Sequence, residues 1–174
     1  MNPEHVILVN TNDEEIGSME KMDAHRQALL HRAFSIFVFN NDRQLLIHRR
    51  ALGKYHSAGL WTNTCCSHPR LGEATIDAAY RRLQEEMGFT CPLEKSFEFI
   101  YKTALEDGLY EHEFDHVFTG DFSGIPNINP EEVSEWKYIS LEELEMDVHV
   151  HPEKYTVWFR IALPRIIEQI KNVA

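Results

Sequence analysis

The sequence has few cysteines and no long apolar run. Its three cysteines are an odd number, and Cys65 and Cys66 are adjacent, which argues against a framework of disulfide bonds. Free thiols suit a reducing compartment, so the cytoplasm is the expected location. No apolar run approaches the ~20 residues of a membrane-spanning helix, and the N-terminus has no basic stretch followed by an apolar block. The sequence therefore predicts neither a membrane span nor a secretory signal.

Positive charge is also scarce, with 17 Lys and Arg against 28 Asp and Glu and a formal net charge of −11. This balance argues against nucleic acid as a partner, because phosphate backbones bind basic surfaces. The few basic residues nevertheless cluster, which favours a local pocket for a small anion. Charge alone leaves a solvated hairpin edge equally open. The clustered residues are Arg43, Arg49, Arg50, Lys54, Arg70, Arg81 and Arg82.

The length of 174 residues indicates a single domain over residues 1–174. Residues 31–40 are apolar on both alternating faces, which is typical of a strand buried on both sides. Residues 44–50 follow an Asn-Asn-Asp turn and are expected to pair back on that strand. Further strands are expected at 97–105, 110–119 and 133–139, and a last helix from about residue 153. We predict an α+β (mixed α/β) fold with a central mixed sheet and helices on its faces.

One helix is expected between residues 75 and 88. Ile76, Tyr80, Leu83 and Met87 are spaced as a single apolar stripe. Gly88 fits the position just after a helix C-terminus. Thr75 is the expected N-cap.

The most informative polar group combines two carboxylates with histidines. Glu111 and Glu113 are two residues apart on an expected strand, so both side chains point to one face. Two close carboxylates repel each other unless a cation lies between them or one keeps its proton. With His25, His31 and His68 they form a nitrogen–oxygen donor set that suits Mn²⁺ or Mg²⁺, or Zn²⁺ with distortion. The alternative for each histidine is a structural or surface role, since the chain has ten.

The cysteine pair is open to two interpretations. A buried, inert thiol is the usual fate of a cysteine. Beside a metal-bound His68 and a basic pocket, Cys66 would be an acid–base or nucleophilic group. These arguments give no preference for Cys66 over Cys65.

The segment from residue 73 to 88 resembles the Nudix box, a loop and helix that present glutamates to Mg²⁺ and a diphosphate. The matching residues are Glu73, Arg81, Glu85, Glu86 and Gly88. Two positions depart from the box: Ser67 replaces its first glycine, and Arg82 replaces the glutamate after its arginine. The second change weakens a metal cluster built for diphosphate hydrolysis and adds a cation for an anionic substrate.

Three motifs together resemble type I isopentenyl-diphosphate isomerase, a Nudix-superfamily enzyme, over residues 21–158. They are Trp-Thr-Asn-Thr-Cys-Cys-Ser-His-Pro (61–69), Arg-Arg-Leu-Gln-Glu-Glu-Met-Gly (81–88) and Glu-His-Glu-Phe-Asp-His (111–116). The resemblance implies a metal-dependent enzyme without flavin, which interconverts isopentenyl and dimethylallyl diphosphate in isoprenoid biosynthesis. The double bond moves by protonation and deprotonation through a tertiary carbocation.

The resemblance also implies a role for each matching residue. The catalytic residues are Cys66, Glu113 and Tyr101. The metal ligands are His25, His31, His68, Glu111 and Glu113, and Glu86 helps to hold Mg²⁺ with the substrate diphosphate. The substrate-binding residues are Lys21, Arg50, Lys54, Ser67, Arg82 and Trp158, the last over the hydrocarbon end.

Two other functions compete with this interpretation. The nearest is a Nudix diphosphohydrolase, which would favour a glutamate at position 82. The other is a non-enzymatic metal-binding or regulatory domain, which would explain the histidines but not the pairing of Cys66 with Glu113 or the basic pocket.

Overall fold

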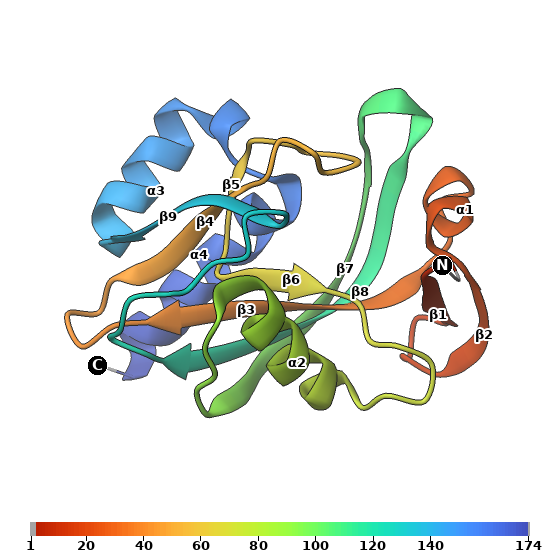
Figure 1. Ribbon diagram of the computed structural model, residues 1–174, viewed down its shortest axis with the longest axis horizontal. Helices are drawn as coiled ribbons and strands as arrows, with labels where there is room; N and C mark the ends of the chain where they lie inside the picture. The colour runs from red at the N-terminus through yellow and green to blue at the C-terminus, as the bar shows by residue number, and fades with distance from the viewer. Residues whose placement is uncertain (1–2, 174) are drawn as a thin grey trace.

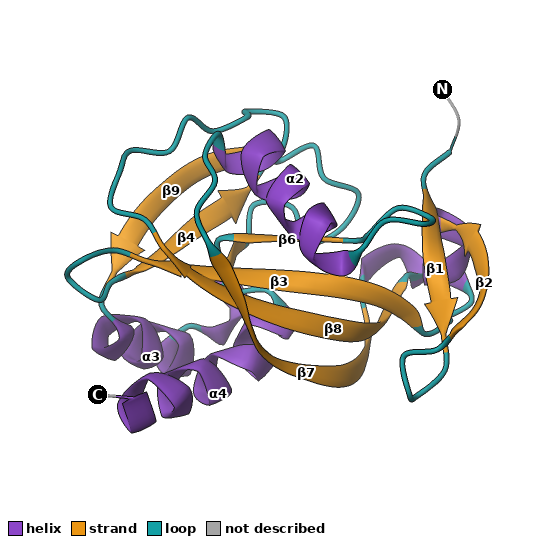
Figure 2. Cartoon of the chain, turned by 90° about the horizontal axis from the view of Figure 1, so that it is seen from below, coloured by secondary structure: helices purple, strands orange, loops and turns teal. Residues whose placement is uncertain are grey.

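The computed structural model describes residues 3–173, and these residues form a curled mixed sheet with helices on both faces (Figures 1 and 2). The sheet of the described chain consists of β1 (His5–Val9), β2 (Glu15–Glu20), β3 (His31–Phe39), β4 (Leu45–Arg50), β5 (Trp61–Thr62), β6 (Cys65–Ser67), β7 (Leu93–Ala104), β8 (Tyr110–Asp121) and β9 (Val133–Ile139). Its α-helices are α1 (Lys21–Arg26), α2 (Thr75–Met87), α3 (Leu141–Val150) and α4 (Val157–Val173). Short 3-10 turns lie at Glu106–Gly108 and Pro152–Lys154. The predicted α+β class is confirmed.

Strand β3 is the centre of the sheet. It pairs in parallel with β8 and antiparallel with β6, and β7 pairs antiparallel with β8. The prediction that residues 44–50 pair back on β3 is correct only beside the turn, at Phe39 and Leu45. Beyond that point β4 pairs with β9 and β5 instead. This departure of β4 from β3 leaves room for β6, which pairs with β3 and carries the cysteine pair.

Two hydrophobic cores occupy the two faces of the sheet, and Figure 2 shows α2 on one side and α3 and α4 on the other. Phe34 and Ile36 of β3 face the core that α2 covers. Phe37 and Phe39 face the core that contains α4 residues such as Ile166. Each such side chain contributes roughly 1.5–3 kcal/mol on burial. The apolar alternation of β3 is thus explained by a strand that is covered on both sides.

The ends of the helices differ in part from the expected ones. The N-cap of α2 is Ala74, which caps without a side-chain hydrogen bond, and Thr75 is the first helical residue. Gly88 ends α2 as predicted, with a φ of +72°, and a Cβ there would clash with the Asn127 carbonyl oxygen. Helix α4 begins at Val157, later than expected, because a 3-10 turn comes first. Among residues 3–173, none of the helices combines the length and the apolar character that a bilayer crossing requires.

Candidate active site

The register of the strands brings the main polar residues to one face of the sheet. His31 of β3 and Tyr101 of β7 both lie opposite Glu113 of β8. Ser35 lies opposite Cys66 of β6. Side chains of directly paired residues point to the same face, and so do alternate residues along one strand. The thiol of Cys66 and the carboxylate of Glu113 therefore lie on the same side of the sheet.

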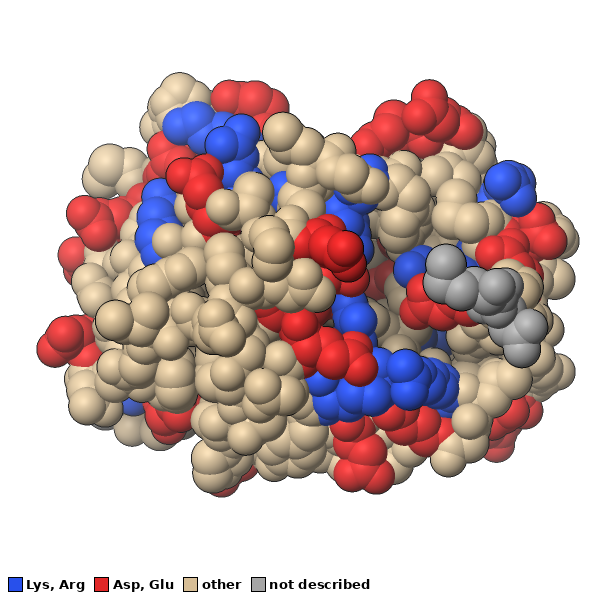
Figure 3. Space-filling model, in the orientation of Figure 1, with Lys and Arg blue, Asp and Glu red and all other residues tan. Residues whose placement is uncertain are grey.

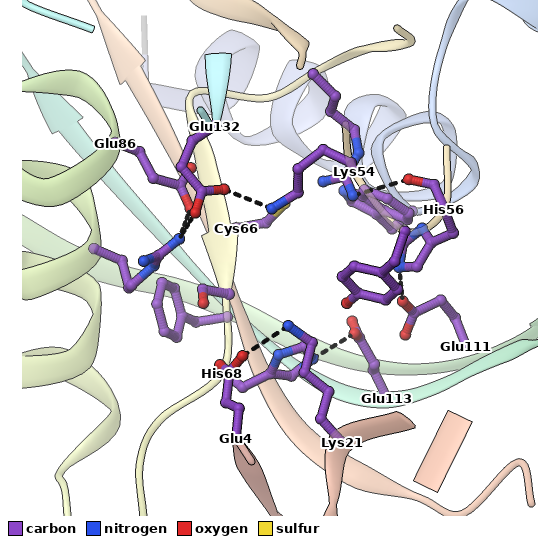
Figure 4. Close-up of a pocket in the computed structure, with 16 residues that line it drawn as sticks. Glu4, Lys21, Lys54, His56, Cys66, His68, Glu86, Glu111, Glu113 and Glu132 are labelled. Carbon is purple, nitrogen blue, oxygen red and sulfur yellow. Dashed lines mark hydrogen bonds and ion pairs between the residues drawn. The ribbon is translucent and has the colours of Figure 1, made fainter. Parts of the chain in front are cut away.

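A cavity of about 110 Å³ opens above these residues, in the hollow that Figure 3 shows among Lys, Arg, Asp and Glu side chains. Figure 4 shows Glu86 and Glu132 on one side of it and Glu111 and Glu113 on the other. Three predicted residues, His25, His31 and Tyr101, are not part of its lining and contact Glu111 or Glu113 instead. The predicted site residues that line it are Lys21, Arg50, Lys54, Cys66, Ser67, His68, Arg82, Glu86, Glu111, Glu113 and Trp158.

Three histidines and one glutamate form a compact group of donor atoms. His25, His31, His68 and Glu111 each offer a ligand atom, and these atoms all lie within 4.8 Å of one another. The Nδ1 atoms of His25 and His31 lie 2.7 and 2.9 Å from the carbonyl oxygens of Lys21 and Leu29. Such carbonyls accept a hydrogen bond from Nδ1–H, which leaves the Nε2 lone pair of the neutral ring for a metal.

Several atoms of this group lack partners. Within residues 3–173, His31 Nε2, His68 Nδ1 and Glu111 Oε2 are buried and make no hydrogen bond. A buried polar atom without a partner costs about 1–3 kcal/mol. One bound cation would satisfy His31 Nε2 and Glu111 Oε2 together, and mixed imidazole and carboxylate donors suit a divalent metal ion. The donor set therefore fits the metal site that the sequence predicts.

Glu113 borders this group and contacts two of its histidines and one further side chain, Tyr101. Its Oε1 lies 3.1 Å from His68 Nε2 and 3.7 Å from His31 Nε2. Burial opposes ionisation of this carboxyl, but the imidazoles of His31 and His68 outweigh it and hold the pKa of Glu113 well below its usual range. The hydroxyl of Tyr101 donates a hydrogen bond to Glu113 Oε2 at 2.8 Å. Burial is the main cause and the negative charge of Glu113 the second cause that raise the pKa of Tyr101 well above its usual range, so the phenol keeps its proton.

The structure distinguishes the two adjacent cysteines. Cys65 is fully buried in the core beneath α2, where its thiol donates to Glu86 Oε2 at 3.5 Å. Cys66 points the other way, because side chains alternate along a strand, and it lines the cavity. Burial raises the pKa of the Cys66 thiol to about 12, although Arg50 opposes the shift. The thiol in the cavity is therefore protonated at neutral pH.

The cations of the cavity are held by carboxylates of this chain. Lys54 Nζ lies 2.5 Å from Glu132 Oε2, and Arg82 contacts Glu85 at 2.7 Å and Glu86. Lys21 pairs in the same way with Glu4, at 2.9 Å. Burial alone would raise the pKa of Glu132, but Lys54 lowers it to about 2. An anionic ligand would therefore meet cations that are already oriented into the cavity.

An aromatic wall closes the cavity beside these charges. Trp158 of α4 is 4% exposed and lines the cavity. The guanidinium carbon of Arg50 lies 5.3 Å from the centre of the Trp158 ring. The Trp158 ring gives the cavity an apolar, electron-rich surface next to its charged end.

Sequence reasoning missed several residues that line the cavity. His56 and Tyr55 follow Lys54 directly, yet neither matches a motif, so only their proximity to Lys54 was a signal. Glu132 comes from the segment before β9, and no spacing in the sequence links it to Lys54 or Arg82. The other residues missed are Glu4 and Phe34.

Comparison with solved structures defines the fold class. A crystal structure of DR0079 from Deinococcus radiodurans superimposes with a TM-score of 0.79 at 21% identity, over 93% of this chain and 98% of that one. A MutT protein from Methanosarcina mazei superimposes with a TM-score of 0.66 at 18% identity, over 82% and 96% of the two chains. The family model described as NUDIX domain matches residues 29–159, so the fold and the box on α2 define a Nudix protein.

Sequence relatives specify the family within that class. An isopentenyl-diphosphate Delta-isomerase 2 from Aromatoleum aromaticum is 53% identical over 164 residues, which cover 94% of this chain and 87% of that protein. A protein of the same name from Photorhabdus laumondii is 54% identical over 90% of this chain and 89% of its own length. The chain belongs to the isopentenyl-diphosphate Delta-isomerase family and is an isomerase with a Nudix fold. The predicted family and enzyme class are confirmed.

Proposed function

We propose that this isomerase interconverts isopentenyl and dimethylallyl diphosphate in the cavity between Cys66 and Glu113. The single observation that supports it best is that a thiol and a carboxylate beside a histidine cluster line the same small cavity. Family membership supports the reaction class, and the position of Cys66 and Glu113 in one cavity supports their choice as the reacting groups.

Moving the double bond needs two proton transfers at two carbons. A proton is added at C4, a tertiary carbocation forms at C3, and a proton is lost from C2. An alkene is a poor base, so a positioned proton donor is required. Cys66 is one proton-transfer group, and Glu113 with its hydrogen-bonded Tyr101 is the other.

The carbocation needs an environment that stabilises it without trapping it. The π face of Trp158 attracts positive charge, by about 2 kcal/mol when the site is desolvated. Trp158 also helps to exclude water from the cavity, and this prevents water from capturing the carbocation as an alcohol. Cations at the other end of the cavity fix the substrate by its diphosphate, and charge-assisted hydrogen bonds hold it in register. The residues proposed for the diphosphate are Lys21, Arg50, Lys54, Ser67 and Arg82.

We propose His25, His31, His68, Glu111 and Glu113 as the ligands of a divalent metal. Mixed imidazole and carboxylate donors suit Mn²⁺ or Mg²⁺, or Zn²⁺ with distortion. A bound metal would act as a Lewis acid that polarises Glu113 and makes the neighbouring proton more acidic. Glu86 is proposed to hold a Mg²⁺ ion that arrives with the substrate diphosphate.

The competing hydrolase function is disfavoured by the contacts of Arg82. Its guanidinium pairs with Glu85 Oε2 and Glu86 Oε1, so a fixed cation of the protein competes for carboxylates that a hydrolytic metal cluster would use and leaves only Oε2 of Glu86 for the proposed Mg²⁺. The isomerase reaction needs no such cluster, and the same guanidinium suits an anionic substrate.

Proton NMR of isopentenyl diphosphate with the enzyme and Mg²⁺ in heavy water tests this function. We expect dimethylallyl diphosphate to appear with deuterium incorporated from the solvent. A parallel incubation with nucleoside diphosphate derivatives should release no phosphate. Phosphate release from that panel without any dimethylallyl product would identify a hydrolase and overturn the proposal.

A further inference from the structure

The loop between β4 and β5 brings a fourth histidine to the cluster. This loop covers residues 51–60 and also carries Lys54. His56 is 3% exposed and lines the cavity beside Glu111, as Figure 4 shows. This burial indicates that the His56 ring is held in one position within the site.

The contacts of His56 differ from those of the proposed metal ligands. His56 Nε2 lies 2.9 Å from Glu111 Oε1, and its Nδ1 lies 3.1 Å from Ser57 Oγ. The Nδ1 atoms of His25 and His31 face backbone carbonyls, which accept hydrogen bonds only, so these rings carry their proton on Nδ1. A hydroxyl can donate as well as accept. His56 is therefore able to accept from Ser57 and to donate its Nε2–H to Glu111.

The two oxygens of Glu111 have different surroundings. Oε1 lies 2.9 Å from His56 Nε2 and 3.1 Å from His25 Nε2. Because His25 carries its proton on Nδ1, His56 is the ring that donates to Oε1. Within the described chain Oε2 is buried without a hydrogen-bond partner, and it lies 3.9 Å from the equally unpartnered His31 Nε2. A hydrogen bond from His56 to Oε1 fixes the rotation of the carboxylate and turns Oε2 toward His31.

His56 also joins this carboxylate to the aromatic wall. The edge of its ring meets Trp158 at a centroid distance of 5.7 Å and an interplanar angle of 86°. Arg50 donates to the His56 carbonyl oxygen at 3.1 Å and lies over the same Trp158 ring. Trp158 and Glu111 thus hold the imidazole and Arg50 holds its backbone, which gives the fixed position that a group orienting a ligand requires.

We propose that His56 is a positioning residue of the metal centre: its neutral ring donates Nε2–H to Glu111 Oε1 and orients Oε2 toward a divalent cation. This inference rests on the metal centre of the proposed function. Partners that orient metal ligands in this way typically change metal affinity 10–100-fold when they are removed.

The test measures the affinity for Mn²⁺ alone, by electron paramagnetic resonance of the free ion, in metal-stripped protein. We expect His56→Ala to bind Mn²⁺ about 10–100-fold more weakly than the wild type. His56→Gln, whose amide NH₂ can donate to Glu111, should recover most of the lost affinity. His149→Ala removes an exposed imidazole from α3 and is the matched control, with wild-type affinity.

The outcomes distinguish a failure of the role proposed for His56 from a failure of the proposed metal centre. A wild-type protein that binds no Mn²⁺ would contradict the proposed metal centre itself. Wild-type binding with unchanged affinity in His56→Ala would overturn the role of His56 and leave the centre intact. Weak binding in both His56→Ala and His56→Gln would overturn the hydrogen-bond role, provided that thermal unfolding shows both variants folded.

Discussion

Two groups of carboxylates differ in their partners, and each sends at least one member, Glu86 in one case and Glu111 and Glu113 in the other, to the same cavity. On α2, Glu85 and Glu86 pair with the guanidinium of Arg82. On β8, Glu111 and Glu113 face imidazoles, at 3.1 Å from His25 and His68 respectively. A guanidinium carries a permanent charge, whereas an imidazole can be neutral and offer a lone pair.

This difference assigns separate tasks to the two sides of the cavity. A cation of the protein already neutralises the α2 carboxylates, so that side is suited to receiving an anionic substrate. The β8 side has buried donor atoms without partners in the described chain, which favours binding of a free metal ion. A Nudix fold thereby supports proton transfer in place of diphosphate cleavage.

Removal of metal should have the largest effect, because it takes away both the ion proposed on the β8 side and the Mg²⁺ proposed to arrive with the substrate diphosphate. We expect strong chelation to reduce turnover of isopentenyl diphosphate to background. Dialysis and addition of Mn²⁺ should restore it, as measured by the rate of dimethylallyl diphosphate formation. An unchanged rate in protein shown by elemental analysis to be free of metal would contradict the site.

Substitution of one carboxylate on each side sharpens the comparison. Glu113→Gln should reduce kcat by about 10²–10⁴-fold, the usual contribution of a general acid–base group. Glu85→Gln on α2 is the matched control and should keep nearly the full rate, since Arg82 rather than a metal is its partner. Equal losses in the two variants, with both folded by circular dichroism, would remove the distinction.

The adjacent cysteines provide a second matched pair. Cys66→Ala should also lose about 10²–10⁴-fold in kcat, because its thiol is a proposed proton-transfer group. Cys65→Ala removes a buried thiol from the core beneath α2 and a weak hydrogen bond to Glu86, so its main effect should fall on the midpoint of thermal unfolding. Full activity in Cys66→Ala would refute the assignment.

Arg82 tests the substrate side of the cavity. Arg82→Gln should lower kcat/KM for isopentenyl diphosphate by about 10–100-fold, because hydrogen bonds to charged groups contribute roughly 1.5–3 kcal/mol. The control is Arg81→Gln, whose guanidinium contacts Glu73 and Glu85 rather than the cavity. If the two variants had the same kcat/KM, Arg82 would have no special role in diphosphate binding.

The smallest effect concerns His48, a buried histidine that faces a carbonyl rather than a carboxylate. Its Nδ1 donates to the Thr64 carbonyl oxygen at 2.9 Å, and burial lowers its pKa to about 4. The unfolded chain binds a proton near pH 6.5 and the folded chain does not, so His48 costs stability as pH falls from 6.5 toward 4. This cost is about 1 kcal/mol between pH 7.5 and 5.5.

His48→Gln should therefore lose less stability than the wild type over that interval. Urea unfolding at the two pH values gives the change in the free energy of unfolding for each protein. Comparing each protein with itself at the two pH values removes any general loss of packing in the variant. An identical pH dependence in both proteins would show that His48 does not resist protonation.

Much of the sheet could be predicted from local pattern. The double-sided apolar alternation of β3 predicted a strand covered on both faces, and the positive φ of Gly88 was expected from its place after α2. Spacing also placed Glu111 and Glu113 on one face, because side chains alternate with a period of two in any strand.

Features that depend on distant pairing were not predictable in this way. The preference of β4 for β9 over β3 depends on the sheet as a whole. The same holds for the loop that places His56 against Glu111, and for the segment that places Glu132 against Lys54. The orientation of Cys66 toward the cavity follows from the register of β6 on β3, which a single strand does not reveal.

The most direct test of the account is the location of a metal in crystals of the substrate-free protein soaked in Mn²⁺. Anomalous diffraction should show the ion among His25, His31, His68, Glu111 and Glu113, with no ion bound to Glu85 or Glu86. An ion held by the α2 glutamates, with none on the β8 side, would contradict the central claim that the metal site lies on β8.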